Sequence, residues 1–175
     1  MITGRNCHSA CTYNDHMVVF GGREATDTGK LFNSILLYSF KDKTWTQPEV
    51  KGKKPAPRVG HIAWVYKGYM FINGGLGAKS DSRYSSRRMI VLKDTVVLDM
   101  TKGFDQLEYI PLEDLPDLTL EGEKQFSSEE EWSSPLRQFH SAQQIGNKIY
   151  TFGGGDGKKW FNDLNVFDWG KLTLN

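Results

Sequence analysis

A short pattern occurs three times in the sequence, and it constrains the fold more than any other feature. An arginine is followed three residues later by a histidine, and thirteen residues after the histidine the chain reaches a pair of glycines. The arginines are Arg5, Arg58 and Arg137, the histidines are His8, His61 and His140, and the glycine pairs are Gly21 and Gly22, Gly74 and Gly75, and Gly153 and Gly154. The arginines are 53 and then 79 residues apart, so spacing is constant inside a repeat and variable between repeats. The pattern predicts an array of similar structural units.

Each repeat is expected to fold as a small antiparallel β-sheet. In the third repeat, residues 140–145 and 148–152 alternate between polar and apolar side chains on either side of a Gly146-Asn147 turn. Residues 162–168 alternate again, and in the first repeat the equivalent segment is followed by a further strand that begins at Thr44-Trp45. The alternation therefore predicts a four-stranded meander for each complete repeat.

A sheet of this size cannot bury both of its faces alone, and similar sheets set face to face around an axis bury them. The composition, with 18 Gly, 10 Phe, 7 Tyr and 5 Trp, suits strands and tight turns. The combination of features resembles the kelch repeat. The features are Arg-x-x-His, an alternating strand, Gly-Gly, a segment such as Asn162-Asp-Leu-Asn-Val-Phe-Asp168, and a Trp such as Trp45. The resemblance implies an all-β fold of kelch-type β-propeller blades, three of which lie in this chain.

The repeat pattern divides the chain into blades, and we assign residues 1–175 to one partial propeller. Its parts are blade one at about 5–50, blade two at about 58–110 with a loop insertion at 76–91, an acidic inter-blade loop at 110–136, and blade three at about 137–175. In blade two, Leu107 or Tyr109 is expected to take the position of Trp45, and in blade three the last strand is expected to be barely present.

Three blades do not close a ring, because propellers have about four to eight. Two explanations stay open at this stage. The chain is a piece of a longer protein that supplies the remaining blades, which we favour, or a second copy joins it in a six-bladed ring.

The repeated residues are expected to be structural. The glycine pairs allow close approach of neighbouring backbones, and the arginines and histidines are expected to hydrogen-bond strand starts or adjacent blades. Three histidines suit a metal, but these three belong to separate blades, so we predict no metal site and no cofactor. No nucleophile, base and orienting acid stand together in the sequence, which predicts a non-enzymatic chain.

Two insertions are expected on one rim of the propeller, because connections after the second and fourth strands emerge at the same end of a blade. The first carries Arg83, Tyr84, Arg87 and Arg88, and the second is acidic. One interpretation is a pair of solvated loops that attract each other weakly. The other is a surface that binds a partner protein through arginines. Ser127 and Ser128, before Glu129, also resemble acceptors of an acidic-directed kinase.

Trp160 is expected on the same rim, next to Lys158 and Lys159. A tryptophan in a loop suits a binding anchor, and it equally suits packing on its own blade, the interpretation that we slightly favour.

The overall charge gives no indication of a nucleic-acid or membrane partner, because 22 basic and 21 acidic residues nearly cancel. The sequence has no secretory apolar core or apolar run of membrane-spanning length, so we predict a cytoplasmic location. The kelch resemblance implies a protein-protein interaction module with an adaptor, scaffold or targeting role. The alternative is a sugar- or metabolite-active propeller enzyme whose site is completed by missing blades, and a deep polar pocket at the ring centre would distinguish it.

Overall fold

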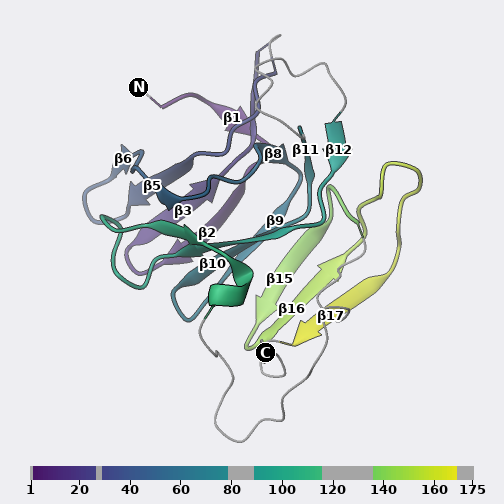
Figure 1. Cartoon of the computed structure of the whole chain (residues 1–175). Coiled ribbons are helices and arrows are strands. Elements are labelled where there is room, and N and C mark those ends of the chain that lie inside the picture. The colour runs from purple at the N-terminus through teal and green to yellow at the C-terminus, as the bar shows by residue number, and fades with distance from the viewer. Residues whose placement is uncertain (1, 27–28, 79–88, 116–135, 169–175) are drawn as a thin grey trace, which may run out of the picture.

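The computed structural model describes residues 2–26, 29–78, 89–115 and 136–168, whose regular secondary structure is almost entirely β-strand (Figure 1). The strands pair mainly antiparallel in several sheets. One 3₁₀ turn, η1 (Leu112–Asp114), follows the strands of the second repeat. The predicted all-β class, built from antiparallel propeller-type sheets, is confirmed.

The first main sheet, blade 1, is a four-stranded meander. Its order is β2 (Ser9–Tyr13), β3 (His16–Phe20), β5 (Ile35–Ser39) and β6 (Thr44–Thr46). Each pair is antiparallel, as expected for strands joined by short connections that carry alternating side chains.

The second main sheet, blade 2, repeats this arrangement with β9 (Ile62–Tyr66), β10 (Tyr69–Asn73), β13 (Thr95–Asp99) and β14 (Glu108–Ile110). A short fifth strand, β7 (Lys51–Gly52), pairs in parallel with β14. Tyr109 of β14 lies opposite Leu98 of β13. In blade 1, Trp45 lies opposite Tyr38 at the equivalent position of the register. The aromatic ring of Tyr109 is buried, so it occupies the tryptophan position with a side chain that faces the core.

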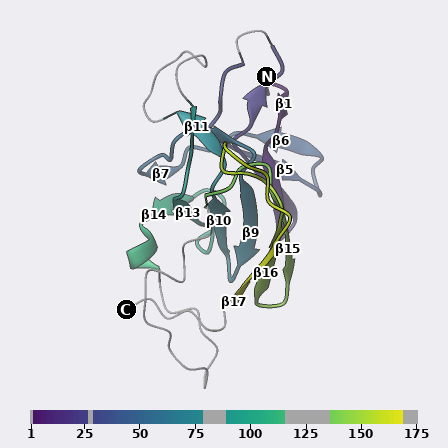
Figure 2. The ribbon, with the colours of Figure 1, turned by 90° about the vertical axis from the view of Figure 1, so that its right-hand side faces the viewer.

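The third main sheet, blade 3, contains β15 (Ser141–Ile145), β16 (Lys148–Phe152) and β17 (Leu164–Asp168) in that order. The predicted remainder of this blade, residues 169–175, lies outside the described residues. In Figure 1 the three sheets lie side by side in sequence order, with blade 3 at one end. Figure 2 views the molecule from the side of blade 3 and shows β15 beside β9.

Two small sheets, which the sequence analysis did not predict, join the ends of the blades. Their strands are β1 (Arg5–Asn6) with β4 (Arg23–Glu24), and β8 (Arg58–Val59) with β11 (Leu76–Ala78) and β12 (Met89–Val91). The second sheet corrects the expected loop at 76–91, because both ends of that insertion are paired strands. The two ends of the insertion therefore extend the small sheet that contains β8.

The apolar core lies between blades, because successive residues of a strand point to opposite faces of its sheet. From β10, Met70 and Ile72 face blade 1 and pack with Val18 and Phe20. Phe71, between them in sequence, packs on the other side against Ile149 of blade 3. Blade 2 is therefore apolar on both faces, and its neighbours cover both.

Candidate functional site

The arginine of the second repeat is a buried connector within its own blade. Arg58 is fully buried and donates through Nη1 to the backbone oxygen of Gly74 at 3.2 Å. Its Nη1 and Nη2 also donate to the two carboxylate oxygens of Asp94 at 3.0 and 2.7 Å. This two-point geometry fixes the end of β10 to the start of β13, because a guanidinium and a carboxylate match each other in plane.

The arginine of the third repeat makes the same contacts. Arg137 donates to Gly153 O at 2.7 Å and to both carboxylate oxygens of Asp163, at 2.7 and 2.5 Å. Hydrogen bonds from Arg137 hold the pKa of Asp163 well below its usual range. In the first repeat, Arg5 donates to Gly21 O at 3.0 Å and to the hydroxyl of Ser34 at 3.2 Å, so a neutral group replaces the carboxylate.

Two of the repeat histidines, His61 and His140, lie at the junctions between blades. The Nε2 atom of His61, in blade 2, lies 2.8 Å from the hydroxyl oxygen of Ser9, in blade 1. Burial, followed by the charge of Arg58, lowers the pKa of His61 to about 3. Burial and the charge of Arg137 lower the pKa of His140 to about 4. Both imidazoles are therefore neutral at pH 7. His61 hydrogen-bonds across the junction to Ser9, whereas the ring nitrogens of His140 have no partner in the described part of the chain, so His140 serves as a packing group.

The paired glycines of one blade contact the Arg-x-x-His segment of the next. The N–H of Gly22 donates to Arg58 O, and the N–H of Gly75 donates to Arg137 O, each at 2.9 Å. Gly75 has a φ of +90°, and a Cβ atom there would come within 2.7 Å of Val59 O. The position therefore requires glycine for both its backbone conformation and its close contact.

Other members of the repeat pattern are less buried. His8 is exposed, and the side chain of Trp45 is 43% exposed with its ring 5.1 Å from that of Tyr38. Among the described residues, no three His, Cys, Asp or Glu side chains lie together in a way that could hold a metal ion.

Several predicted rim residues cannot be placed. Outside the described residues lie most of the acidic segment 110–136, the two serines predicted to be phosphorylation sites, and Arg83, Tyr84, Arg87 and Arg88. The partner-binding interpretation of these residues stays a prediction.

The loop between β16 and β17 presents the described part of the rim. The Oδ1 atom of Asp156 accepts hydrogen bonds from the N–H groups of Lys158 and Lys159 at 2.8 and 2.9 Å, and these donors lower the pKa of Asp156. Trp160 pairs with Gly155 through a backbone bridge, yet its side chain is 75% exposed. The indole lies against the backbone of its own loop, since a Cβ atom on Gly155 would come 3.0 Å from its Cε3 atom, and most of its surface is nevertheless exposed.

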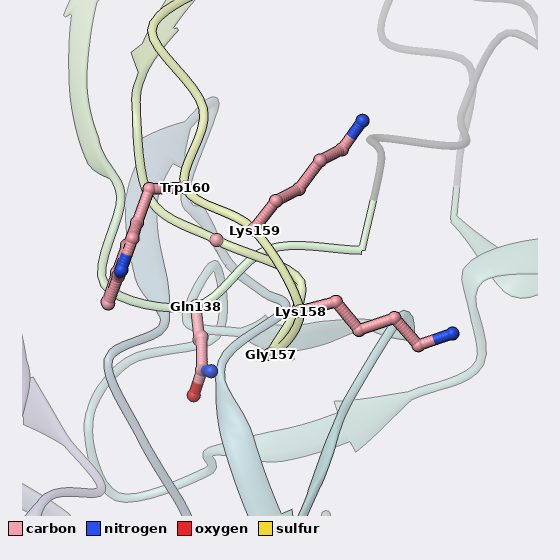
Figure 3. A pocket seen from close by; sticks show the side chains of 6 residues that line it. Gln138, Gly157, Lys158, Lys159 and Trp160 are labelled. Atoms are coloured by element: carbon pink, nitrogen blue, oxygen red, sulfur yellow. The ribbon is translucent and has the colours of Figure 1, made fainter.

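A shallow pocket of about 160 Å³ lies at this loop, lined by Gln138, Gly155, Gly157, Lys158, Lys159 and Trp160. In Figure 3, the indole of Trp160 and the amide of Gln138 lie on one side of the loop, and both lysines extend away from them. The Oε1 atom of Gln138 is buried and has no hydrogen-bond partner in the described part of the chain. The sequence analysis missed Gln138, because only the backbone bridge between Gln138 and Gly155 brings it to the loop.

A second, wider hollow of about 370 Å³ lies along the innermost strands β2, β9 and β15. Its polar lining comes from Thr12, Gln143 and Gln144, and its one titratable lining group is the thiol of Cys11. Burial raises the pKa of Cys11 to about 12, so the thiol is protonated at pH 7. This described lining offers no pair of groups for acid-base or nucleophilic chemistry. None of the helices in the described ranges is long and apolar enough to span a bilayer.

Similar antiparallel sheets, joined by a repeated Arg-x-x-His to Gly-Gly junction, define a repeat protein of the β-propeller class. The sequence profile of the KLHDC2/KLHL20/DRC7 Kelch-repeats domain matches residues 1–110, and the chain belongs to the kelch-repeat family. The resemblance seen in the sequence is therefore confirmed.

Three relatives illustrate the range of proteins that this chain is similar to. A leucine-zipper-like transcriptional regulator 1 homolog of Drosophila melanogaster is 30% identical over 91% of this chain and 14% of its own length. Human Kelch domain-containing protein 3 is 26% identical over 92% of this chain and 37% of its own length. The Bos taurus Rab9 effector protein with kelch motifs is 35% identical over 39% of this chain and 18% of its own length. The chain thus spans well under half the length of these relatives.

Proposed function

We propose that this chain is a non-catalytic protein-interaction module whose rim, at the loop from Asp156 to Trp160, holds a partner protein. One observation carries the proposal: Trp160 is 75% exposed on a loop whose backbone is fixed by hydrogen bonds. An exposed tryptophan on a rigid element is a typical interface anchor, because it offers a large contact area and loses little conformational entropy on binding.

The surroundings of Trp160 indicate the chemistry of the partner. Lys158 and Lys159 add two positive charges, and the Oε1 atom of Gln138, a buried acceptor in the pocket lining, has no hydrogen-bond partner in the described part of the chain. A partner segment with an apolar side chain, a hydrogen-bond donor and nearby carboxylates fits this arrangement. Arg83, Tyr84, Arg87 and Arg88 are proposed as further members of the same surface, since their positive charge would favour the same acidic partner.

The relatives support an interaction role in general terms, since one is named as a Rab9 effector and another as a transcriptional regulator. An adaptor, scaffold or targeting role is our proposal for this chain. We also propose a cytoplasmic location, with which the two free thiols, Cys7 and Cys11, are compatible because reducing compartments preserve thiols.

The enzyme alternative has less support. A catalytic propeller would need convergent titratable groups at the ring centre, and the described inner hollow has a protonated thiol and amides instead. In the enzyme alternative, the missing catalytic groups would come from blades outside this chain.

The proposal is tested by quantitative capture of proteins from cell extract on the immobilised chain. Trp160→Ala is expected to reduce recovery of specific partners about tenfold or more, the loss typical of a central aromatic anchor. Trp45→Ala is the matched control, because Trp45 is also a partly exposed tryptophan but lies on blade 1. Unchanged capture by the Trp160 variant, or an equal loss in both variants, would overturn the proposed site.

A further inference from the structure

The junction between blades 1 and 2 is filled by apolar side chains beside its glycine pair. Phe20 and Ile35 lie opposite each other on β3 and β5 of blade 1, and they are 0% and 1% exposed. Ile72 of β10 packs with them from blade 2 in one core cluster. The ring of His61 lies 5.3 Å from that of Phe20, and its Nε2 atom has the hydroxyl of Ser9 as a partner at 2.8 Å. The single buried histidine of this junction is therefore surrounded by apolar groups and hydrogen-bonded to the preceding blade.

The junction between blades 2 and 3 has polar side chains at the same positions. Asn73 and Thr95 form the pair that corresponds to the Phe-Ile pair of blade 1, in the same register of β10 and β13. Asn73 shares a strand face with Phe71, which packs toward blade 3. Thr151 of β16 corresponds to the isoleucine of β10, and it shares a strand face with Ile149, which packs toward blade 2. Three apolar positions of the first junction are thus polar in the second.

These polar groups are enclosed, and several lack a partner. Asn73 and His140 are 8% and 7% exposed, and Thr151 is 0% exposed. Asn73 Nδ2 donates to Thr95 Oγ1 at 2.9 Å. The Oγ1 atom of Thr151 and both ring nitrogens of His140 have no hydrogen-bond partner among the described residues. His140 has no hydroxyl to bond because Ile62 holds the place in blade 2 that a serine holds in blade 1. Buried polar atoms without a partner are rare in folded proteins, so these atoms call for one.

The second junction also has more room than the first. The backbone hydrogen bond from the second glycine to the carbonyl of the repeat arginine has the same length, 2.9 Å, in both junctions. Asparagine and threonine are smaller than phenylalanine and isoleucine, so equal backbone spacing leaves more space between the side chains. A Cβ atom on Gly74 would lie 3.5 Å from Cε1 of His140, whereas the equivalent distance between Gly21 and His61 is 2.8 Å. The imidazole of the second junction is therefore set back from the preceding blade.

We propose that the junction between blades 2 and 3 binds an ordered water molecule, which bridges His140 and Thr151 of blade 3 to Asn73 of blade 2. A buried water needs room and about two to four polar partners. A neutral imidazole has one donor and one acceptor nitrogen, a hydroxyl donates and accepts, and the amide oxygen of Asn73 accepts. The bridge joins these blades by hydrogen bonds at the place where blades 1 and 2 are joined by apolar packing. The inference goes beyond the proposed rim function, because it uses no residue of the loop from Asp156 to Trp160.

The first test detects the water directly. Magnetic relaxation dispersion counts the buried water molecules of the wild-type chain, and nuclear Overhauser effects from water to the ring protons of His140 locate this one. The comparison variant combines Asn73→Phe, Thr95→Ile and Thr151→Ile with Ile62→Ser, which reproduces the first junction. It should hold about one buried water fewer than the wild-type chain. Equal counts in the two proteins, or no Overhauser effect in the wild-type chain, would overturn the proposal.

A single substitution tests the bridge without repacking the junction. Thr151→Val removes the hydroxyl and keeps the shape of the side chain. It should lower Tm by about 2–4 °C, because the water loses one of its partners. If the hydroxyl were only a buried group without a partner, its removal would raise Tm, since the cost of its desolvation would disappear. A raised or unchanged Tm would therefore overturn the proposal.

The matched control is Ile72→Thr, which places the same hydroxyl at the corresponding position of the first junction. There Phe20 and Ile35 fill the space with apolar groups. The control should lower Tm and leave the number of buried water molecules unchanged. A gain of one water in this variant would also count against the proposal, because a hydroxyl alone would then suffice to hold it. Circular dichroism establishes that each variant is folded, and the measurement of the wild-type chain stands even where a variant is not.

Discussion

The ion pair between Arg58 and Asp94 allows the role of the repeat arginine to be measured. Removing one partner of a buried ion pair costs about 3–5 kcal/mol, because the remaining charge is left without compensation. The side chain of Asp94 is 49% exposed, and Arg58 keeps two carbonyl acceptors, Gly74 O and Ala56 O, each at 3.2 Å. These two facts place Asp94→Ala at the lower end of that range, at about 3 kcal/mol.

Blade 1 contains the matched control. Ser34 holds the equivalent position, where Arg5 is only partly buried and donates to a neutral hydroxyl at 3.2 Å. Ser34→Ala is expected to cost about 1 kcal/mol or less. In a chain of this size, 1 kcal/mol corresponds to about 2–4 °C in Tm, so Asp94→Ala should lower Tm by about 6–12 °C and Ser34→Ala by no more than about 4 °C.

The assay is thermal and urea unfolding followed by circular dichroism, completed as a double-mutant cycle. In an Arg58→Met background, Asp94→Ala should cost less than about 1 kcal/mol, because no buried guanidinium remains to be left unpaired. Equal losses for the Asp94 and Ser34 variants would refute the reasoning. Full additivity of the Arg58 and Asp94 changes would refute it as well.

Two further predictions concern the junctions. Gly75→Ala should destabilise the chain by about 2 kcal/mol or more, because its φ of +90° and the 2.7 Å approach to Val59 O both oppose a side chain. Gly146→Ala, with φ of +60° and open space around it, is the control and should cost about 1 kcal/mol. Equal Tm values for the two variants would contradict the prediction. The pKa values of His61 and His140, about 3 and about 4, lie below the unfolded value of 6.5, so the unfolded chain takes up protons first as the pH falls. Stability should therefore be complete above pH 6.5 and decline between pH 6.5 and about 3, with Tm against pH as the measurement. His140→Gln should make the decline shallower, and an unchanged Tm over this range would contradict the prediction.

The sequence predicted the fold class because the kelch pattern consists of local signals. Alternating side chains, turn residues and glycine pairs are properties of short segments, and they indicate strands wherever the segments lie in space. The small sheets were missed because their strands are only two or three residues long and pair with distant segments. Leu76–Ala78, for example, pairs with Arg58–Val59 and Met89–Val91, and no periodicity in three residues could reveal that.

The candidate site was predictable only in part. The sequence singled out Lys158, Lys159 and Trp160 as loop residues on a rim. It could not give the exposure of Trp160, because a loop side chain packs inward or outward according to the surface that its neighbours leave free. Nor could it identify Gln138, whose place at the pocket depends on a backbone bridge to Gly155, 17 residues away in sequence.

The amino-acid sequence by itself determined the repeated unit, since strand alternation and glycine conformations follow from local stereochemistry. The tertiary structure decided how equivalent residues differ from one blade to the next. Phe20 and Phe152 occupy the same position in their repeats, yet the first is buried and the second is 54% exposed. The physical reason is that burial belongs to the junction between two blades, and a junction forms only where an adjacent blade is present to cover the sheet.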